Sequence, residues 1–241
     1  MKKALPYILF FSLFAYLIIV LTFAKTKLGD VKCEGLQVVV GDTDENAFID
    51  ENEVLAVIKR GYGDIKGRNI VEIDKDSIER VLVKNSVIKS AQIYYSLDGN
   101  FHVEITQRKP VLRVLAGDGY YVDEDGKIMP LSGKYTSRVV VATGNISRKF
   151  ACNGLYPFVM ALKEDDFWDA LIEQIVVEKE DEVVLIPKVG SFRIVFGKVD
   201  DYAVKLDKLR FFLKEGIALK GWNVYKEINL KFDNQVVCVK R

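Results

Sequence analysis

The sequence predicts an α+β protein that begins with a single transmembrane helix, continues with a small βααββ domain and ends in a β-rich domain with a mostly antiparallel sheet and flanking helices. Two observations lead to this prediction. Residues 4–24 contain no charged side chain. Beyond them, apolar residues recur at helical spacing in a few segments, and short runs rich in β-branched residues are more numerous.

The uncharged stretch Ala4–Ala24 has the length of a membrane span. As a helix it would be about 31 Å long, against about 30 Å for the hydrocarbon core of a bilayer. Its aromatic and aliphatic residues cover every face, unlike those of an amphipathic helix. A cleaved signal peptide is the alternative, because Lys2 and Lys3 form a basic start and 22–24 loosely resemble a cleavage site. Signal peptides have shorter apolar regions of roughly 7–15 residues, so we expect an uncleaved anchor.

The charges beside this stretch nearly balance. Lys2 and Lys3 precede it, and Lys25, Lys27 and Lys32 follow it. The positive-inside count therefore leaves the orientation open. A short N-terminus before a large C-terminal part favours an arrangement in which the large part lies outside the cell membrane.

The composition argues against several classes of function. Lys and Arg number 35 against 34 Asp and Glu, so the net charge is +1. This balance does not indicate the basic surface that binds nucleic acid. Cys33, Cys152 and Cys238 lie far apart without a C-x-x-C pair, so a zinc or redox motif is not supported and at most one disulfide is possible.

The first globular segment has the pattern of a small α/β domain. It contains, in order, a strand at Leu36–Val40, a helix begun by the capping-box pair Asp50 and Glu53, a helix from near Asp74, and strands at Ser90–Ser96 and Asn100–Thr106. The Asp98-Gly99 pair between the last two strands is a strong hairpin signal.

The segment Gln107-Arg108-Lys109-Pro110 comes next, and Pro110 cannot donate to a sheet ladder. We therefore place a domain boundary here. The rest is dominated by strands at Val111–Leu115, Gly119–Val122, Lys127–Pro130, Arg138–Ala142, Ile175–Glu178, Val183–Ile186, Phe192–Phe196, Lys226–Phe232 and Gln235–Val239. Helices are predicted at Leu155–Leu162, at Phe167–Leu171 and after Asp200-Asp201, the last with Ala203, Leu206, Leu209 and Leu213 on its buried face.

The predicted organisation follows from these boundaries. It comprises a cytoplasmic start (1–3), a transmembrane helix (4–24), a neck (25–34), a small domain (35–108) and a β-rich domain (109–241).

The ordered set of features is similar to the FtsQ/DivIB family of bacterial cell-division proteins. The matching motifs are Gln107-Arg108-Lys109-Pro110, where the family usually has Glu-Arg-Lys-Pro, the hairpin Tyr121–Lys127, Gly190 with Phe192–Gly197, and the closing Ile228–Asn234. Their variants resemble those of the branch found in Bacteroides-like bacteria. No single motif identifies the family; their order along essentially the whole chain does.

The resemblance implies a POTRA-like domain followed by the family's β domain. It also implies a non-enzymatic scaffold of the division complex in the periplasm, which recruits FtsB-like and FtsL-like single-span partners and influences septal peptidoglycan synthesis. No cofactor, metal, nucleic acid or small-molecule substrate is expected. Arg108, Lys109 and Pro110 form the family's domain junction.

The closing segment offers a physical route to partner binding. Its predicted partner-binding residues are Gln235, Val236, Val237, Cys238 and Val239. These residues are apolar on both faces of the strand, and an edge strand can accept a strand from another chain. The alternative is a strand that helices of the same domain cover. Many family members continue beyond this point with a further element that carries partner contacts.

Residues with catalytic chemistry have simpler explanations. His102 is the only histidine and alternates with apolar residues along a predicted strand. The acidic run Asp123-Glu124-Asp125-Gly126 fits a hairpin better than a calcium loop. A membrane-tethered periplasmic cell-wall enzyme with paired carboxylates is the alternative function, and a POTRA-bearing transport component is a third.

Overall fold

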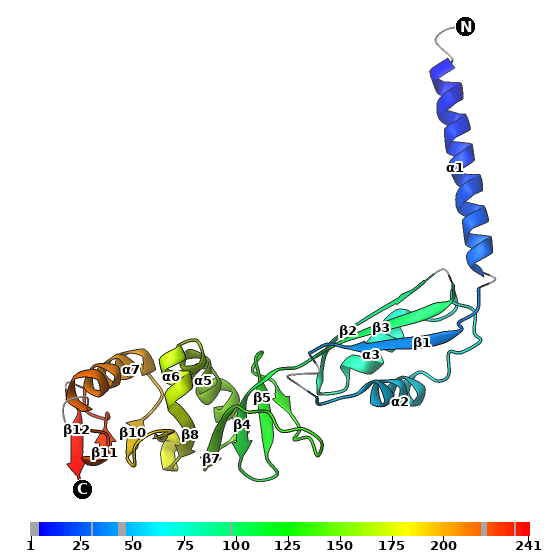
Figure 1. The fold of residues 1–241 in the computed structure, drawn as a ribbon. Coiled ribbons are helices and arrows are strands. Elements are labelled where there is room, and N and C mark those ends of the chain that lie inside the picture. Colours follow the sequence, from blue (N-terminus) through cyan, green and yellow to red (C-terminus); the bar gives the residue numbers. More distant parts are fainter. Residues whose placement is uncertain (1–4, 30, 43–46, 97, 218–220, 234) are drawn as a thin grey trace. The chain divides into compact units, whose positions relative to one another are not determined.

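A computed structural model describes residues 5–29, 31–42, 47–96, 98–217, 221–233 and 235–241, with the side chains of the first helix described for 9–22. The chain divides into two compact units, Met1–Gln107 and Arg108–Arg241 (Figure 1).

The N-terminal helix α1 covers Leu5–Gly29. Its large apolar side chains between residues 9 and 21 are 44–71% exposed. Within the part of the chain that the structure describes, no helix is both long and apolar enough to cross a membrane. The span predicted at 4–24 therefore stays a prediction.

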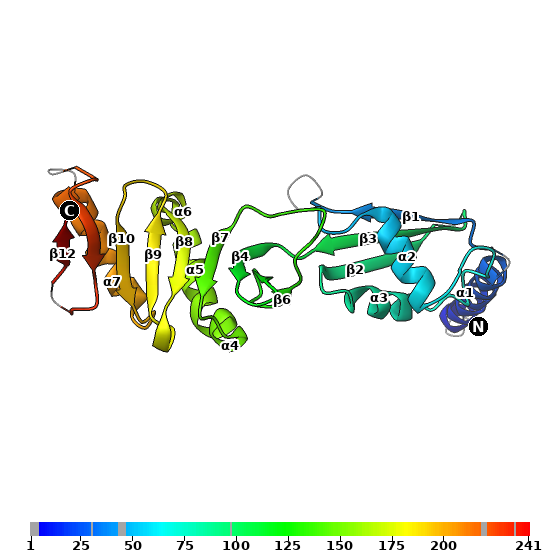
Figure 2. The same ribbon diagram turned by 90° about the horizontal axis from the view of Figure 1, so that it is seen from below.

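Beyond α1, the described part of the first unit forms a three-stranded sheet with two helices. Its elements are β1 (Gly35–Val40), α2 (Glu51–Gly61), α3 (Lys75–Val83), β2 (Ile88–Tyr95) and β3 (Asn100–Gln107). The strand order is β1-β3-β2, with β1 parallel and β2 antiparallel to β3. Helices α2 and α3 cover one face of this sheet (Figures 1 and 2). The predicted order of strand, helix, helix, strand, strand is confirmed.

Local side-chain bonds explain where the two helices begin. Asp50 accepts the backbone N–H of Glu53 at 2.8 Å, and Glu53 accepts that of Asp50 at 3.1 Å, which confirms the capping box. Asp74 caps α3 by accepting the backbone N–H of Ser77 at 3.1 Å. In the predicted hairpin turn, Leu97 lies outside the described residues.

The described residues of the second unit form one sheet of nine strands and a set of helices. The strands are β4 (Pro110–Leu115), β5 (Tyr120–Asp123), β6 (Ile128–Met129), β7 (Val140–Gly144), β8 (Ile172–Val177), β9 (Val183–Pro187), β10 (Arg193–Gly197), β11 (Tyr225–Asn229) and β12 (Val237–Lys240). The helices are α4 (Arg148–Phe150), a π-helix (Ala151–Leu155), α5 (Tyr156–Lys163), α6 (Asp166–Leu171), a 3₁₀ turn (Lys179–Asp181), α7 (Tyr202–Phe211) and a second π-helix (Phe212–Ile217).

The strand order in this sheet is β12-β11-β10-β9-β8-β7-β4-β5-β6. The pairs β4–β7, β7–β8 and β10–β11 are parallel, and the other pairs are antiparallel. The crossovers from β7 to β8 and from β10 to β11 both pass through helices and both advance toward β12. Because such crossovers are right-handed, they place their helices on the same face. Figures 1 and 2 show α5, α6 and α7 on one face of the sheet and none of them on the other.

The core of the second unit lies between the sheet and these helices. Phe158 of α5 and Phe196 of β10 are fully buried, with ring centroids 4.9 Å apart. The prediction that Ala203 lies on the buried face of α7 is wrong, since Ala203 is exposed. Tyr202 takes this place, because it precedes the buried Leu206 by four residues and its larger ring reaches Phe158 at 5.8 Å.

Several predicted boundaries also differ from the observed ones. The last strand begins at Val237, so Gln235 and Val236 precede it. The predicted helix Leu155–Leu162 corresponds to α5 and is preceded by a π-helical turn. Hydrophobic periodicity does not separate a π-turn from the α-helix beside it.

Gly144, at the end of β7, is expected to be essential for the second unit. Its φ is +102°, and an added Cβ would lie 2.1 Å from the carbonyl oxygen of Val177. We expect Gly144→Ala to lower the free energy of unfolding by more than about 2 kcal/mol. Urea unfolding followed by tryptophan fluorescence measures this, because Trp168 and Trp222 both lie in the second unit.

The matched control is Gly117→Ala. Gly117 also has a positive φ, +59°, but no atom lies within 4 Å of an added Cβ. Its cost should be limited to the backbone conformation, about 1 kcal/mol. Equal losses in the two variants would show that the close approach to Val177 has no part in stability.

Candidate functional site

The junction between the two units begins with the buried side chain of Gln107. Its Oε1 accepts the backbone N–H groups of Phe48 at 3.0 Å and Ile49 at 3.2 Å, and its Nε2 donates to the carbonyl oxygen of Gly41 at 3.0 Å. These bonds attach the end of β3 to the segment between β1 and α2. The glutamate that is usual in the family has no N–H to donate to Gly41, so the amide suits this site.

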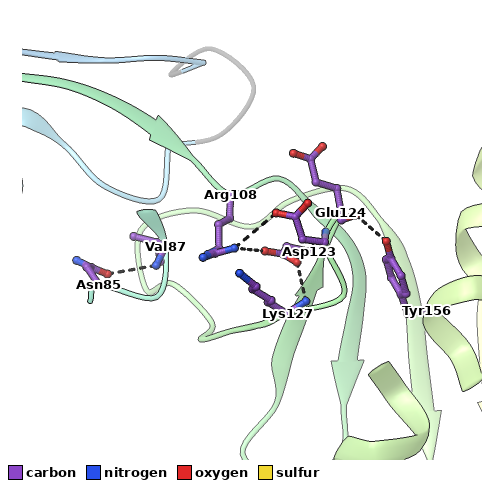
Figure 3. A network of polar contacts seen from close by, with 8 residues as sticks. Asn85, Val87, Arg108, Asp123, Glu124, Lys127 and Tyr156 are labelled. Carbon is purple, nitrogen blue, oxygen red and sulfur yellow. Dashed lines mark hydrogen bonds and ion pairs between the residues drawn. The ribbon is translucent and has the colours of Figure 1, made fainter. Parts of the chain in front are cut away.

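The next residue, Arg108, forms a buried ion pair within the second unit. Its Nη1 lies 2.8 Å from Oδ2 of Asp123, whose side chain is fully buried (Figure 3). The other carboxylate oxygen, Oδ1, accepts the backbone N–H groups of Asp125 at 3.0 Å and Lys127 at 2.7 Å. Asp123 thus stabilises the β5–β6 hairpin with one carboxylate oxygen and pairs with Arg108 through the other. These bonds agree with the predicted hairpin and not with a calcium-binding loop.

Lys109 and Pro110 continue this network. The carbonyl oxygen of Lys109 accepts the backbone N–H of Glu124 at 2.9 Å, and the hydroxyl of Tyr156 donates to the carbonyl oxygen of Glu124 at 2.6 Å (Figure 3). Pro110 is the first residue of β4, a position where a strand tolerates proline. The contacts described for Arg108, Lys109 and Pro110 thus support the second unit, and sequence reasoning alone did not reveal the Arg108–Asp123 pair.

The predicted partner-binding residues lie at the other end of the second unit. Among the described strands, β12 pairs only with β11, so it is an outer strand of the sheet. Val237 and Val239 are 37% and 39% exposed, while Val236 and Cys238 are partly buried against the core. One face of the strand therefore rests on its own domain and the other is open.

The hydrogen bond of Arg241 shows which backbone groups of β12 face β11 and which face the open side of the strand. The backbone N–H of Arg241 donates to the carbonyl oxygen of Val224, at 3.2 Å. Backbone groups of successive residues in a strand point to opposite sides, so those of Val237 and Val239 face β11. The same alternation turns the backbone groups of Lys240 toward the open side.

The structure gives no specific support to an enzyme with paired carboxylates. Three acidic side chains line a hollow of about 440 Å³ in the second unit. Its acidic lining residues, Glu180, Asp181 and Asp200, are all exposed, whereas a general acid has its pKa raised by burial. Over the described residues, no cluster of three or more His, Cys, Asp or Glu side chains is arranged to hold a metal ion.

A serine–histidine pair is present but lacks the geometry of a nucleophile and its base. The Ser96 hydroxyl lies 3.4 Å from Nε2 of His102 and donates to Asp98. Hydrogen bonds from Ser96 and Asn100 lower the pKa of Asp98 to about 2. The Asp98 carboxylate thus accepts a hydrogen bond from the Ser96 hydroxyl itself, in place of orienting the histidine.

None of the three cysteines, all of which lie in the described part of the chain, forms a disulfide. Burial raises the pKa of the Cys33 and Cys152 thiols, which disfavours the reactive thiolate form.

Two family models match the chain. Residues 31–106 match the POTRA-like domain, and residues 109–239 match the family described as FtsQ/DivIB, C-terminal related. The second match covers more than half of the 241 residues. A search of curated proteins found no match.

Arg108→Ala is expected to destabilise the second unit strongly. It leaves the buried carboxylate of Asp123 without its cation, and removing one partner of a buried pair costs about 3–5 kcal/mol. Urea unfolding followed by tryptophan fluorescence measures the loss.

The control is Arg193→Ala. The guanidinium of Arg193 lies 2.8 Å from the Glu227 carboxylate, and the Arg193 side chain is 55% exposed. An exposed pair contributes about 0–1 kcal/mol. The double variant Arg108→Met with Asp123→Asn should recover part of the loss, since no buried charge remains and the Asn amide oxygen can still accept the hairpin N–H groups. A loss for Arg108→Ala no greater than that for Arg193→Ala would contradict the structural role of the buried pair.

Proposed function

Because the chain belongs to the FtsQ/DivIB, C-terminal related family, we propose that it is a non-enzymatic scaffold of the bacterial division complex, anchored in the inner membrane with its C-terminal portion in the periplasm and enriched at the septum. The proposed partners are FtsB-like and FtsL-like single-span proteins. Through them the scaffold influences septal peptidoglycan synthesis.

The observation that supports partner binding best is the position of β12 at the end of the sheet. An edge strand presents backbone donors and acceptors that another chain can complete. In such an addition, main-chain bonds supply affinity and the alternate side chains supply specificity. The side chains that a partner strand meets at this edge are the exposed Val237 and Val239 and, on the core side, Cys238.

The end of the strand carries positive charge, which disfavours uncontrolled pairing of like chains. Lys240 is exposed, and the Arg241 guanidinium donates to the carbonyl oxygen of Ser191. A partner strand with acidic residues opposite this end would be attracted, whereas a second β12 would bring like charges together.

The proposed anchor is residues 4–24, uncleaved, with 1–3 in the cytoplasm. Within α1, residues 9–22 are uncharged, and their large apolar side chains are exposed along the helix. Exposed apolar surface of this kind needs either lipid or another protein. The neck at 25–34 then leads to the proposed domains 35–108 and 109–241, with Arg108, Lys109 and Pro110 as their junction.

Lys240→Pro is expected to weaken binding of the FtsB-like partner without unfolding the second unit. Proline removes the backbone N–H that faces the open side, and a net hydrogen bond is equivalent to roughly three- to tenfold in affinity. Co-purification of the full-length chain with the FtsB-like protein from membranes measures binding, and tryptophan fluorescence measures unfolding.

The paired control is Val237→Pro, which removes a donor on the side of β11. This variant should lose stability as well as binding, because it breaks a bond inside the sheet. Normal partner recovery with a folded Lys240→Pro variant would rule out strand addition at this edge.

Membrane anchoring is tested by placing arginine in the middle of α1. Leu13→Arg with Leu17→Arg should move the chain from the membrane to the soluble fraction, since each arginine at the centre of a span costs about 3 kcal/mol. Leu13→Phe with Leu17→Phe keeps the helix apolar and should stay in the membrane. If mass spectrometry of the mature wild-type chain finds residues 1–24 missing, the segment is a cleaved signal peptide.

A further inference from the structure

Among the described elements, helices α5, α6 and α7 all lie on one face of the nine-stranded sheet, and a row of uncharged side chains crosses the other face. The strand registers place one residue from each of seven neighbouring strands in this row: Leu115, Thr143, Val176, Val184, Val195, Asn229 and Val237. Most of these side chains are apolar or β-branched. Apolar sheet faces are normally buried against another layer, so this face has the chemistry of an interface.

Arg113 lies in the adjacent row of the same face. The registers align it with Tyr121 on one side and with Val141, Gln174 and Ile186 on the other, so none of these neighbours is a carboxylate. The carboxylate farther along the row, Glu227 of β11, is paired with Arg193. The guanidinium of Arg113 lies 5.8 Å from the ring centroid of Tyr121. Its Nε is buried and has no hydrogen-bond acceptor among the described residues.

A buried donor without an acceptor is costly, and other polar groups on this face avoid that cost. Arg193 donates from both Nε and Nη2 to the Glu227 carboxylate, at 2.9 and 2.8 Å. Gln174 donates to the hydroxyl of Thr143, at 2.8 Å. Arg113 as a whole is half-buried, so it is a cation on an apolar face whose guanidinium calls for a carboxylate from outside the described chain.

We propose that this face binds an amphipathic helix of another protein and that an Asp or Glu of the helix pairs with Arg113. A helix suits the face because it satisfies its own backbone bonds, whereas a strand laid flat on side chains would leave its bonds unmade. The row of seven strands spans roughly 29 Å at about 4.8 Å per strand, which matches a helix of about 19 residues.

This surface is distinct from the edge of β12, where binding depends on main-chain groups. The two meet at Val237 and Val239, where the rows of the open face end on β12. The proposal therefore rests on Arg113 and the uncovered face alone, and it can fail while strand addition at β12 holds.

The test is site-specific photocrosslinking of the full-length chain in the cells that produce it. Val195, near the middle of the uncharged row, is replaced by p-benzoylphenylalanine, and the crosslinked peptide is identified by mass spectrometry. We expect an adduct with a segment of helical periodicity that contains Asp or Glu. In Arg113→Gln the adduct should fall about tenfold, as for a lost charge-assisted hydrogen bond.

Arg193→Gln is the matched control, because it removes a cation from the same face that already has a partner in Glu227. It should leave the adduct unchanged. If tryptophan fluorescence shows that Arg113→Gln unfolds the unit, Arg113→Lys serves in its place. It keeps the charge but lacks the Nε donor, and the adduct should fall several-fold.

Three results would overturn the proposal. They are the absence of any adduct at position 195, an adduct of equal yield with and without Arg113, and an adduct whose peptide comes from a second copy of this chain or contains no acidic residue.

Discussion

Backbone hydrogen bonding in an open sheet has to stop at two outer strands, and the function proposed for the second unit depends on how it stops. One end is β6, which contains only Ile128–Met129. The other end is β12, with the four residues Val237–Lys240. A very short edge strand offers little template for pairing, whereas a longer strand with exposed valines offers more. The two ends are therefore unequal, and β12 is the better acceptor of a partner strand.

The same connections that build the sheet also leave one face uncovered. Both helical crossovers advance toward β12 from parallel strands, so right-handedness sends α5, α6 and α7 to one side. The core is complete on that side. The opposite side keeps an uncharged row and Arg113, whose Nε–H has no acceptor among the described residues, so the proposed partners have both an edge and a face to bind.

At the junction, in contrast to Arg113, the buried arginine is paired with a carboxylate of the same unit. Arg108 and Asp123 neutralise each other, and hairpin amides occupy the remaining oxygen of Asp123. Gln107 in turn uses both ends of its amide within the first unit. Consecutive residues thus hold different units, which gives the Gln107–Pro110 motif a structural reason. Arg108 therefore stabilises the fold through its pair with Asp123, whereas Arg113 is the arginine proposed to bind a partner.

Local signals in the sequence predicted local structure well. The capping box of Asp50 and Glu53 depends on residues three apart, and the βααββ order depends on short periodic segments. The face of α7 was mistaken at Ala203, because periodicity alone does not weigh a large Tyr202 four residues from Leu206 against a small alanine.

Features that depend on distant residues were not predictable in this way. The pairing of Arg108 with Asp123, the parallel pairs in the sheet and the uncovered face all follow from strand order, which hydrophobic patterns do not specify. The edge position of the last strand was one of two open alternatives, because a strand apolar on both sides also fits a covered position.

Depletion of the full-length protein in dividing cells, followed by measurement of cell length and septum number, tests whether it is a scaffold of the division complex. Loss of such a scaffold should give long cells that continue to grow without forming septa. Normal septation after complete depletion would exclude that role.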